Sequence, residues 1–389
     1  MRYNIELTIF FKILFTIDLF LAFFYIFHSN HKWFGSGFLI GLFWFWWIGL
    51  SFRYYNLSWM VPIAILIIAF IYGVIFYLIG KVYELLKDEI VKKFFLVLVF
   101  VFGFDYISLF TFDWLKSEVL FVNSLFGIEK VVIFLVIYSI AFYKKLKSLS
   151  FLLLTIAIFI KSSPIKEPKL DIYVASTNID QDKKWDKSFL SEQLNSNFNI
   201  INKAIELKKD VVILPESAFP MFLNLYPELI DKLKKLSKKI VIITGALHLK
   251  DNKFYNSTYV FQNTKLIILD KHKLVPFGEY IPIAFFQKEI NEFFFNGASD
   301  YYVSDNFGVF NIKKYKFINA ICYEVTLKEL YKLKPNYIVA LSNVAWFMPS
   351  IMPSLQQMII KVYSKKYKKI VYHSINGFKS YIVKNSLLY

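Results

Sequence analysis

The stretch Val211-Val212-Ile213-Leu214-Pro215-Glu216 decides how the second half of this chain is interpreted. Its four apolar residues run without polar alternation, which is typical of a strand that is buried on both faces of a layered fold. Proline then ends the strand, and a carboxylate follows at once. The stretch therefore predicts a central strand of an α/β sheet with a chemically active side chain at its carboxyl end.

Further predicted strands lie on both sides of this stretch, with predicted helices between several of them. Short β-rich runs alternate with helical stretches at 186–208 and 227–237, and this alternation predicts an α/β layer fold for the second half. The other predicted strands are 171–177, 240–244, 257–262, 265–269, 316–321, 337–342 and 369–373.

The first part of the chain differs in composition. Overall, 57% of the 389 residues are hydrophobic and the mean hydropathy is +0.46, above the roughly 45–50% apolar content of soluble domains. The excess lies before about residue 162, and a linker with two prolines follows at 161–168. We therefore expect a multi-span transmembrane domain at 1–163 and a globular domain at 164–389.

Five apolar runs predict membrane helices at 34–52, 59–80, 94–110, 130–143 and 148–160. A sixth run, 6–27, is interrupted by Lys12 and Asp18, and a charge in mid-membrane costs at least ~2.5 kcal/mol. This run is either one tilted span or a hairpin that breaks near Asp18. We prefer the hairpin, which gives seven crossings.

The charged loops predict the orientation in the membrane. Lys144, Lys145 and Lys147 form the densest basic loop, so we place that loop in the cytoplasm. The span 148–160 then delivers the globular domain to the opposite side. With the hairpin, every basic cluster faces the cytoplasm.

The net charge is +17, and the chain has one cysteine. A basic balance can indicate nucleic-acid binding, an anionic membrane surface or only biased base composition, and the abundance of Lys, Asn, Ile, Phe and Tyr favours compositional bias. Among so many apolar spans we relate the charge to the membrane, because lysines collect at cytoplasmic ends, and no nucleic-acid motif is present. One cysteine cannot form a disulfide within the chain. No metal-ligand cluster or nucleotide loop is visible in the sequence, so we expect no cofactor.

Three segments place reactive side chains directly after predicted strands. Glu216 follows the quoted stretch, Lys271 follows 266–269, and Cys322 follows Ala320-Ile321. Ligands bind beyond the carboxyl ends of strands in α/β sheets. Glu216 can take the thiol proton of Cys322, and Lys271 can stabilise the thiolate and then an oxyanion. The three side chains predict acyl transfer through a thioester.

The sequence around these residues resembles the nitrilase (carbon–nitrogen hydrolase) superfamily, and more closely the apolipoprotein N-acyltransferases. The matching motifs are Pro215-Glu216-Ser217-Ala218, the segment from Asp270-Lys271 to Leu274-Val275-Pro276-Phe277-Gly278-Glu279, and Ile321-Cys322-Tyr323-Glu324. Further segments that resemble this family, in order along the chain, are 35–38 with Trp44 and Trp47, 113–116, 178–186, 255–257 and 342–347.

The resemblance implies a polytopic α-helical membrane domain of seven helices followed by an αββα sandwich on the periplasmic side of a bacterial inner membrane. It implies a catalytic triad of Glu216, Lys271 and Cys322. Such enzymes take an acyl chain from a phospholipid, hold it as a thioester, and give it to the N-terminal amine of a diacylglyceryl-cysteine lipoprotein. The residues to which the resemblance assigns supporting or substrate-binding roles are Glu279, Tyr323, Glu324, Trp185, Asn256 and Trp346.

The chain also departs from the family pattern. Val344 stands where the family usually has Asp, and Met348 stands where it has Gly. The family also implies one further membrane helix after the region of Asn376-Gly377, and no such apolar run follows in this sequence. These differences concern substrate binding and leave the triad unchanged.

Two other functions are alternatives to the acyltransferase. In a membrane-tethered amidase or nitrilase, the same triad would attack an amide, and water would complete the reaction. The several membrane spans disfavour this function, because a simple tether needs only one helix. A non-enzymatic scaffold or transporter would use Lys12 and Asp18 as an ion path. Retention of all three triad residues disfavours that function.

Overall fold

The structure is a computed structural model of the full chain. It describes residues 2–29, 32–55, 57–108, 112–160, 165–276, 279, 301–384 and 387–388. The predicted linker residues 161–164 and the motif residues Phe277 and Gly278 lie outside the described residues.

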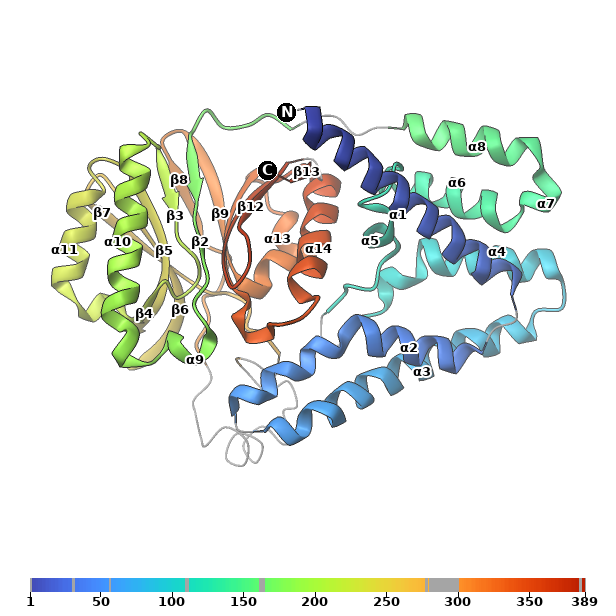
Figure 1. Ribbon diagram of the computed structural model, residues 1–389, viewed down its shortest axis with the longest axis horizontal. Helices are drawn as coiled ribbons and strands as arrows, with labels where there is room; N and C mark the ends of the chain where they lie inside the picture. Colours follow the sequence, from blue (N-terminus) through green and yellow to red (C-terminus); the bar gives the residue numbers. More distant parts are fainter. Residues whose placement is uncertain are drawn as a thin grey trace. The chain divides into compact units, whose positions relative to one another are not determined.

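The chain forms two compact units, which are described separately. The first contains Met1–Gly49, Trp59–Ser163 and Gln357–Val362, and the second contains Leu50–Ser58, Pro164–Gln356 and Tyr363–Tyr389. The first unit is helical, and the second contains two β-sheets (Figure 1). The predicted class, a helical membrane domain followed by an α/β domain, is confirmed.

The helices of the first unit are α1 (Arg2–His28), α2 (Trp33–Phe45), α3 (Val61–Leu85), α4 (Glu89–Val101), α5 (Ser117–Phe121), α6 (Lys130–Ala141), α7 (Tyr143–Leu146) and α8 (Ser148–Phe159). Helices α1, α2, α3, α4, α6 and α8 overlap apolar runs that the sequence predicts as membrane helices. Within the described part of the chain, three helical stretches are long and apolar enough to cross a bilayer: Ile9–His28, Trp33–Arg53 and Ser58–Leu85. The chain is a multi-pass membrane protein.

The predicted hairpin within 6–27 is wrong. Helix α1 is continuous over Arg2–His28, and Asp18 lies on its exposed surface. The segment contains neither glycine nor proline, and a charged side chain does not interrupt the backbone hydrogen bonds that hold a helix together. The hydroxyl of Thr16 donates to the carbonyl of Lys12 at 2.7 Å, inside the same helix. The prediction of seven membrane crossings depended on this hairpin, so it is wrong as well.

Helices α2 and α3 pack closely through glycines. A Cβ at Gly37 would lie 2.4 Å from the Tyr72 carbonyl oxygen, and a Cβ at Gly41 would lie 2.8 Å from the Ala69 Cα. Small residues let helix backbones approach in a membrane, where lipid and side chains are equally apolar. Gly37 belongs to the 35–38 motif, so packing against α3 explains that part of the motif.

Replacing Gly37 by alanine should destabilise the helical unit by about 1–3 kcal/mol, because the added methyl group meets backbone that cannot move aside. Thermal unfolding of the protein in detergent micelles measures this effect. Gly35→Ala is the matched control, since a Cβ at Gly35 would meet only the Lys32 Cβ, at 3.9 Å. Equal melting temperatures for the two variants would contradict the packing described here.

The second unit contains two sheets. The first sheet has the order β1-β3-β5-β6-β7, with β4 paired to β5. Its strands are β1 (Ile172–Val174), β3 (Val211–Ile213), β4 (Phe219–Phe222), β5 (Val241–Lys250), β6 (Lys253–Gln262) and β7 (Lys265–Asp270). β1, β3 and β5 are parallel, and β6 is antiparallel to both β5 and β7, so β3 and β7 end at the same edge.

The second sheet has the order β13-β12-β11-β10-β9-β8, with β2 paired to β11. Its strands are β2 (Ser176–Thr177), β8 (Val309–Ile312), β9 (Tyr315–Ile321), β10 (Tyr337–Asn343), β11 (Ile370–Asn376), β12 (Tyr381–Lys384) and β13 (Leu387–Leu388). β9, β10 and β11 form its parallel centre.

The two sheets face each other across an apolar core. Val211, Ile213 and Val260 of the first sheet pack with Phe317 and Leu341 of the second. On the outer face of the first sheet, helices α10 (Leu190–Glu206) and α11 (Pro227–Leu236) bury an amphipathic stripe. Helices α13 (Lys328–Tyr331) and α14 (Met352–Tyr367) lie beyond the second sheet (Figure 1), which gives the αββα order.

Candidate active site

Cys322 lies at the turn where β9 ends. It opens the 3-10 helix η7 (Cys322–Thr326), and its backbone φ is 53°, in the left-handed region that side chains other than glycine rarely adopt. The side chain is 9% exposed. A strained turn at the carboxyl end of a central parallel strand projects the thiol beyond the sheet.

Glu216 lies beyond the end of β3 in an equally tight turn. The next residue, Ser217, has a φ of 48°. A Cβ at Gly245 on β5 would lie 2.5 Å from the Ser217 nitrogen and 2.6 Å from the Glu216 Cα, so only glycine lets the turn lie against β5. The carboxylate accepts hydrogen bonds from the Asn256 side-chain amide at 2.8 Å and from the Asn343 backbone N–H at 2.7 Å.

Lys271 follows β7 and is fully buried. Its ammonium donates to both carboxylate oxygens of Glu279, at 2.8 and 2.6 Å. Its backbone N–H donates to the Asn256 carbonyl at 2.9 Å. The Asn256 amide, already bonded to Glu216, also lies 3.3 Å from Glu279. Asn256 therefore connects the carboxylate of Glu216 to the Lys271–Glu279 pair.

Glu324 connects the segments that carry the lysine and the cysteine. Its carboxylate accepts backbone N–H bonds from His272 and Lys273 at 2.7 and 2.9 Å, and from Ile321 at 2.7 Å. These bonds join the residues after Lys271 to the residue before Cys322. Burial raises the pKa of Glu324 to about 7, although the charge of Lys271 and the three backbone bonds oppose the rise.

The three triad side chains lie close enough to shift one another's protonation. Burial raises the pKa of Cys322 well above its ordinary value, and the charge of Glu216, to which the thiol is hydrogen-bonded, raises it further; Lys271 opposes both. Burial also raises the pKa of Glu216, again against Lys271. The resting site therefore holds a neutral thiol beside a carboxylate that is more basic than an exposed glutamate.

Lys271 behaves in the opposite sense from an isolated buried lysine. Burial alone would lower the pKa of its ammonium. The charges of Glu279, Glu216, Cys322 and Glu324 outweigh burial and raise that pKa. Lys271 thus stays charged throughout the working range of an enzyme and supplies a fixed positive charge beside the thiol. Such a charge stabilises an oxyanion that forms on a bound acyl group.

Three further residues that the sequence analysis assigned to the site, Tyr323, Trp346 and Trp185, differ in how deeply they are buried. Tyr323 follows Cys322 in η7 and is buried. Trp346, in the 3-10 helix η8 (Val344–Phe347), is half-buried. Trp185 follows the short helix α9 (Gln181–Lys184) and is 42% exposed, so it presents an aromatic surface to its surroundings.

Several residues that bear on the site were missed by the sequence analysis. The Asn343 side chain donates to Gln181 at 2.8 Å and accepts from the Asn376 amide at 2.8 Å, which fixes the backbone that holds Glu216. Tyr301 is near Glu279 and Glu216; burial and these two charges raise its pKa to about 12. Gln181 and Asn343 lie in the motifs 178–186 and 342–347, and this membership could have indicated a role at the site. Tyr301 lies in no motif, so nothing in the sequence indicated its position near the site.

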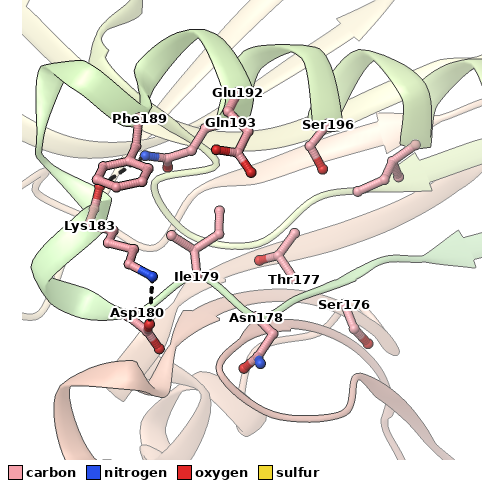
Figure 2. A pocket seen from close by; sticks show the side chains of 11 residues that line it. Ser176, Thr177, Asn178, Ile179, Asp180, Lys183, Phe189, Glu192, Gln193 and Ser196 are labelled. Carbon is pink, nitrogen blue, oxygen red and sulfur yellow. Dashed lines mark hydrogen bonds and ion pairs between the residues drawn. The ribbon is translucent and has the colours of Figure 1, made fainter.

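A surface pocket of about 410 Å³ lies beside the segment from β2 to α9 (Figure 2). Thr177, Ile179 and Gln193 line it, and none of the triad residues does. Among the residues that the structure describes, no group of three or more His, Cys, Asp or Glu side chains is placed to hold a metal ion.

Comparisons with known proteins match both parts of the chain to described families. Residues 2–162 match the apolipoprotein N-acyltransferase integral membrane domain, and residues 173–368 match the carbon-nitrogen hydrolase family. The apolipoprotein N-acyltransferase of Wolinella succinogenes is 35% identical, over 92% of this chain and 86% of that protein. The apolipoprotein N-acyltransferase of Campylobacter jejuni is 38% identical, over 91% of this chain and 79% of that protein.

Among solved structures, a CN-hydrolase superfamily protein from Xanthomonas campestris is similar at a TM-score of 0.42 and 12% identity. That similarity covers 57% of this chain and 85% of the other.

Proposed function

The chain belongs to the apolipoprotein N-acyltransferase family, and on that premise we propose that it carries an acyl chain from a membrane phospholipid, as a thioester on Cys322, to the N-terminal amine of a diacylglyceryl-cysteine apolipoprotein. The chain is an acyltransferase by family. The observation that supports the thioester step is the burial of the Cys322 thiol, which is hydrogen-bonded to Glu216 and feels the positive charge of Lys271.

The first half-reaction begins with Glu216. Its carboxylate takes the thiol proton as the Cys322 sulfur attacks the ester carbonyl carbon of the phospholipid, and a C–S bond forms. The negative charge that develops on the carbonyl oxygen lies near the Lys271 ammonium. The C–O bond then breaks, and Glu216 returns the proton to the departing alcohol oxygen. The products are a lysophospholipid and an acyl thioester on the enzyme.

The second half-reaction uses the same residues in the reverse order. The acceptor amine attacks the thioester carbonyl, and Glu216 takes a proton from the nitrogen. The C–S bond breaks, an amide forms, and the thiolate is reprotonated by Glu216. Glu279 holds the Lys271 ammonium with two hydrogen bonds, so the positive charge stays fixed through both steps.

We assign residues 1–163 to the membrane domain and 164–389 to a catalytic domain on the periplasmic side of a bacterial inner membrane. The basic loop of Lys144, Lys145 and Lys147 supports this orientation, because lysines collect at cytoplasmic ends. Trp185 and Trp346 are assigned to the lipid-facing mouth of the site. Protease added to intact spheroplasts should digest the catalytic domain; digestion only after lysis would contradict the orientation.

The fate of the acyl group tests the proposed function. Purified enzyme is given a phosphatidylethanolamine with a labelled acyl chain, with or without a synthetic diacylglyceryl-cysteine peptide. We expect labelled amide on the peptide and little free fatty acid without it, because a thioester at a lipid-facing site is protected from water. Free fatty acid formed at the same rate without peptide would support a carbon–nitrogen hydrolase that uses water as its acceptor.

A further inference from the structure

Lys184 is a buried lysine that the mechanism above does not use. It is the last residue of α9, and it is 0% exposed. Within the described part of the chain, its ammonium has no hydrogen-bond partner. Its neighbour Lys183 is different: its side chain is 53% exposed and reaches Asp180 at 3.4 Å, as Figure 2 shows.

A buried ammonium without a partner is costly for a fold, because burial removes its hydration and nothing replaces it. Burial lowers the pKa of Lys184 to about 8, and the negative charge of Glu216 opposes that fall. Lys184 therefore carries its charge at neutral pH. Glu216 is the carboxylate whose charge acts on it.

The surrounding hydrogen bonds hold α9 beside Glu216. Gln181, the first residue of the helix, accepts from the Asn343 side chain at 2.8 Å, and the Asn343 backbone N–H donates to Glu216 at 2.7 Å. At the other end of α9, the Gln193 amide donates to the Lys184 carbonyl at 3.1 Å. The position of Lys184 is thus fixed by the same polar network that positions the carboxylate.

We propose that Lys184 is a positioning residue that keeps Glu216 in its negatively charged, proton-accepting form by supplying a second buried positive charge to the site. This inference rests on the proposed role of Glu216 as the base. Lys184 acts through Glu216 and needs no contact with the substrate. The site holds several acidic groups around Lys271, so a second positive charge limits their mutual repulsion.

The charged and titratable groups around Glu216 determine whether the loss of the Lys184 charge raises or lowers the pKa of Glu216. Lys271 stabilises the charged carboxylate, whereas burial and Glu279 destabilise it. The groups around Glu216 that carry charge or titrate are Lys271 after β7, Glu279, Cys322 at the end of β9, Tyr301 and Lys184 on α9. Because the negative charge of Glu216 acts on the buried Lys184, removing the positive charge of Lys184 should raise the pKa of Glu216.

The test is the pH profile of the full-length enzyme in detergent micelles. Activity that needs charged Glu216 falls as the pH drops through the pKa of this carboxylate. In Lys184→Met, the acidic limb of kcat/KM for transfer from phosphatidylethanolamine to a diacylglyceryl-cysteine peptide should move to higher pH by about half a unit or more. Lys184→Arg should keep the wild-type limb, and so should the matched surface control Lys183→Met.

Stability separates this role from a structural one. Methionine has a similar volume and no charge, so the melting temperature of Lys184→Met should be equal to or above that of the wild type. A lower melting temperature with a uniform loss of activity at every pH would overturn the proposal, as would an unmoved acidic limb. If the methionine variant does not fold, Lys184→Gln removes the charge in the same assay while keeping a polar end.

A second readout does not depend on acyl transfer. The rate at which iodoacetamide alkylates Cys322 also depends on proton removal by Glu216, so its acidic limb should move in the same direction in Lys184→Met. If the wild type forms no thioester but this limb still moves, the proposed function fails and the role of Lys184 stands. If the wild type forms the thioester and neither limb moves, the role of Lys184 fails alone.

Discussion

Glu216→Gln should lower the rate of thioester formation by about 10²–10⁴-fold while leaving the protein folded, because the amide cannot accept the thiol proton. Glutamine keeps the size of the side chain, and its carbonyl oxygen can still accept one of the two hydrogen bonds that hold Glu216, from the Asn256 amide at 2.8 Å or from the Asn343 N–H at 2.7 Å. Pre-steady-state acylation by labelled phospholipid measures the loss.

The pH dependence gives the Glu216 variant a specific signature. The wild-type rate should fall on the acidic side, as Glu216, whose pKa burial raises, becomes protonated. In Glu216→Gln that limb should vanish, and the residual rate should rise with pH as the thiol ionises without a base. Glu329→Gln, at a carboxylate whose side chain is 53% exposed, is the control. A variant with a wild-type rate and an unchanged profile would exclude Glu216 as the base.

Lys271→Met should cost both activity and stability. The substitution leaves the Glu279 carboxylate, which is bonded to Lys271 at 2.6 and 2.8 Å, beside Glu216 without a positive partner. Breaking a buried ion pair by removing one partner costs about 3–5 kcal/mol. Loss of the fixed charge at the oxyanion should lower acylation by a further 10²–10³-fold, roughly the effect of removing one oxyanion donor.

Thermal unfolding and acylation rates of Lys271→Met are compared with those of Lys273→Met. Lys273 is two residues away, and its 43% exposed side chain lies 3.8 Å from Glu329, so its removal should change neither quantity measurably. A Lys271→Met variant as stable as the wild type would contradict a stabilising Lys271–Glu279 ion pair.

Most of the second unit could be predicted from the sequence because its central strands are continuous apolar runs. The predicted strand at 211–214 is observed as β3, and the one at 337–342 as β10. The strands that were missed include β4, β8 and β12, which are short strands of four residues each. A four-residue strand carries too few alternations to stand out from a loop.

The helical unit shows a different limit. The sequence predicted the positions of its apolar helices, but the charge of Asp18 was wrongly taken as a helix break. The free energy of placing a charged side chain in the membrane is one quantity, and the continuity of the backbone hydrogen bonds is another. Only the backbone hydrogen bonds decide whether a helix is interrupted. The contacts that make Gly37 necessary depend on Tyr72 and Phe76 of α3, which are distant from Gly37 in the chain, so local sequence could not show them.

The sequence could predict the site residues that directly follow strands, but not the residues that packing brings to the site from elsewhere in the chain. Glu216 and Lys271 follow β3 and β7, which end at the same edge of the first sheet, and Cys322 follows β9 of the second sheet. Motif resemblance selected these three residues. The hydrogen bond from the Asn343 N–H to Glu216 and the burial of Lys184 within the electrostatic influence of Glu216 arise only through tertiary packing. In a chain with 46 lysines and arginines, nothing in the sequence separates buried Lys184 from exposed Lys183.

The thioester on Cys322 is the central claim, and the intact mass of the purified protein after incubation with phospholipid tests it most directly. We predict a hydroxylamine-sensitive mass increase of one acyl chain on the wild type. The increase should be absent from Cys322→Ala and should disappear when a diacylglyceryl-cysteine peptide is added. No acyl adduct on folded wild-type protein, or the same adduct on Cys322→Ala, would contradict it.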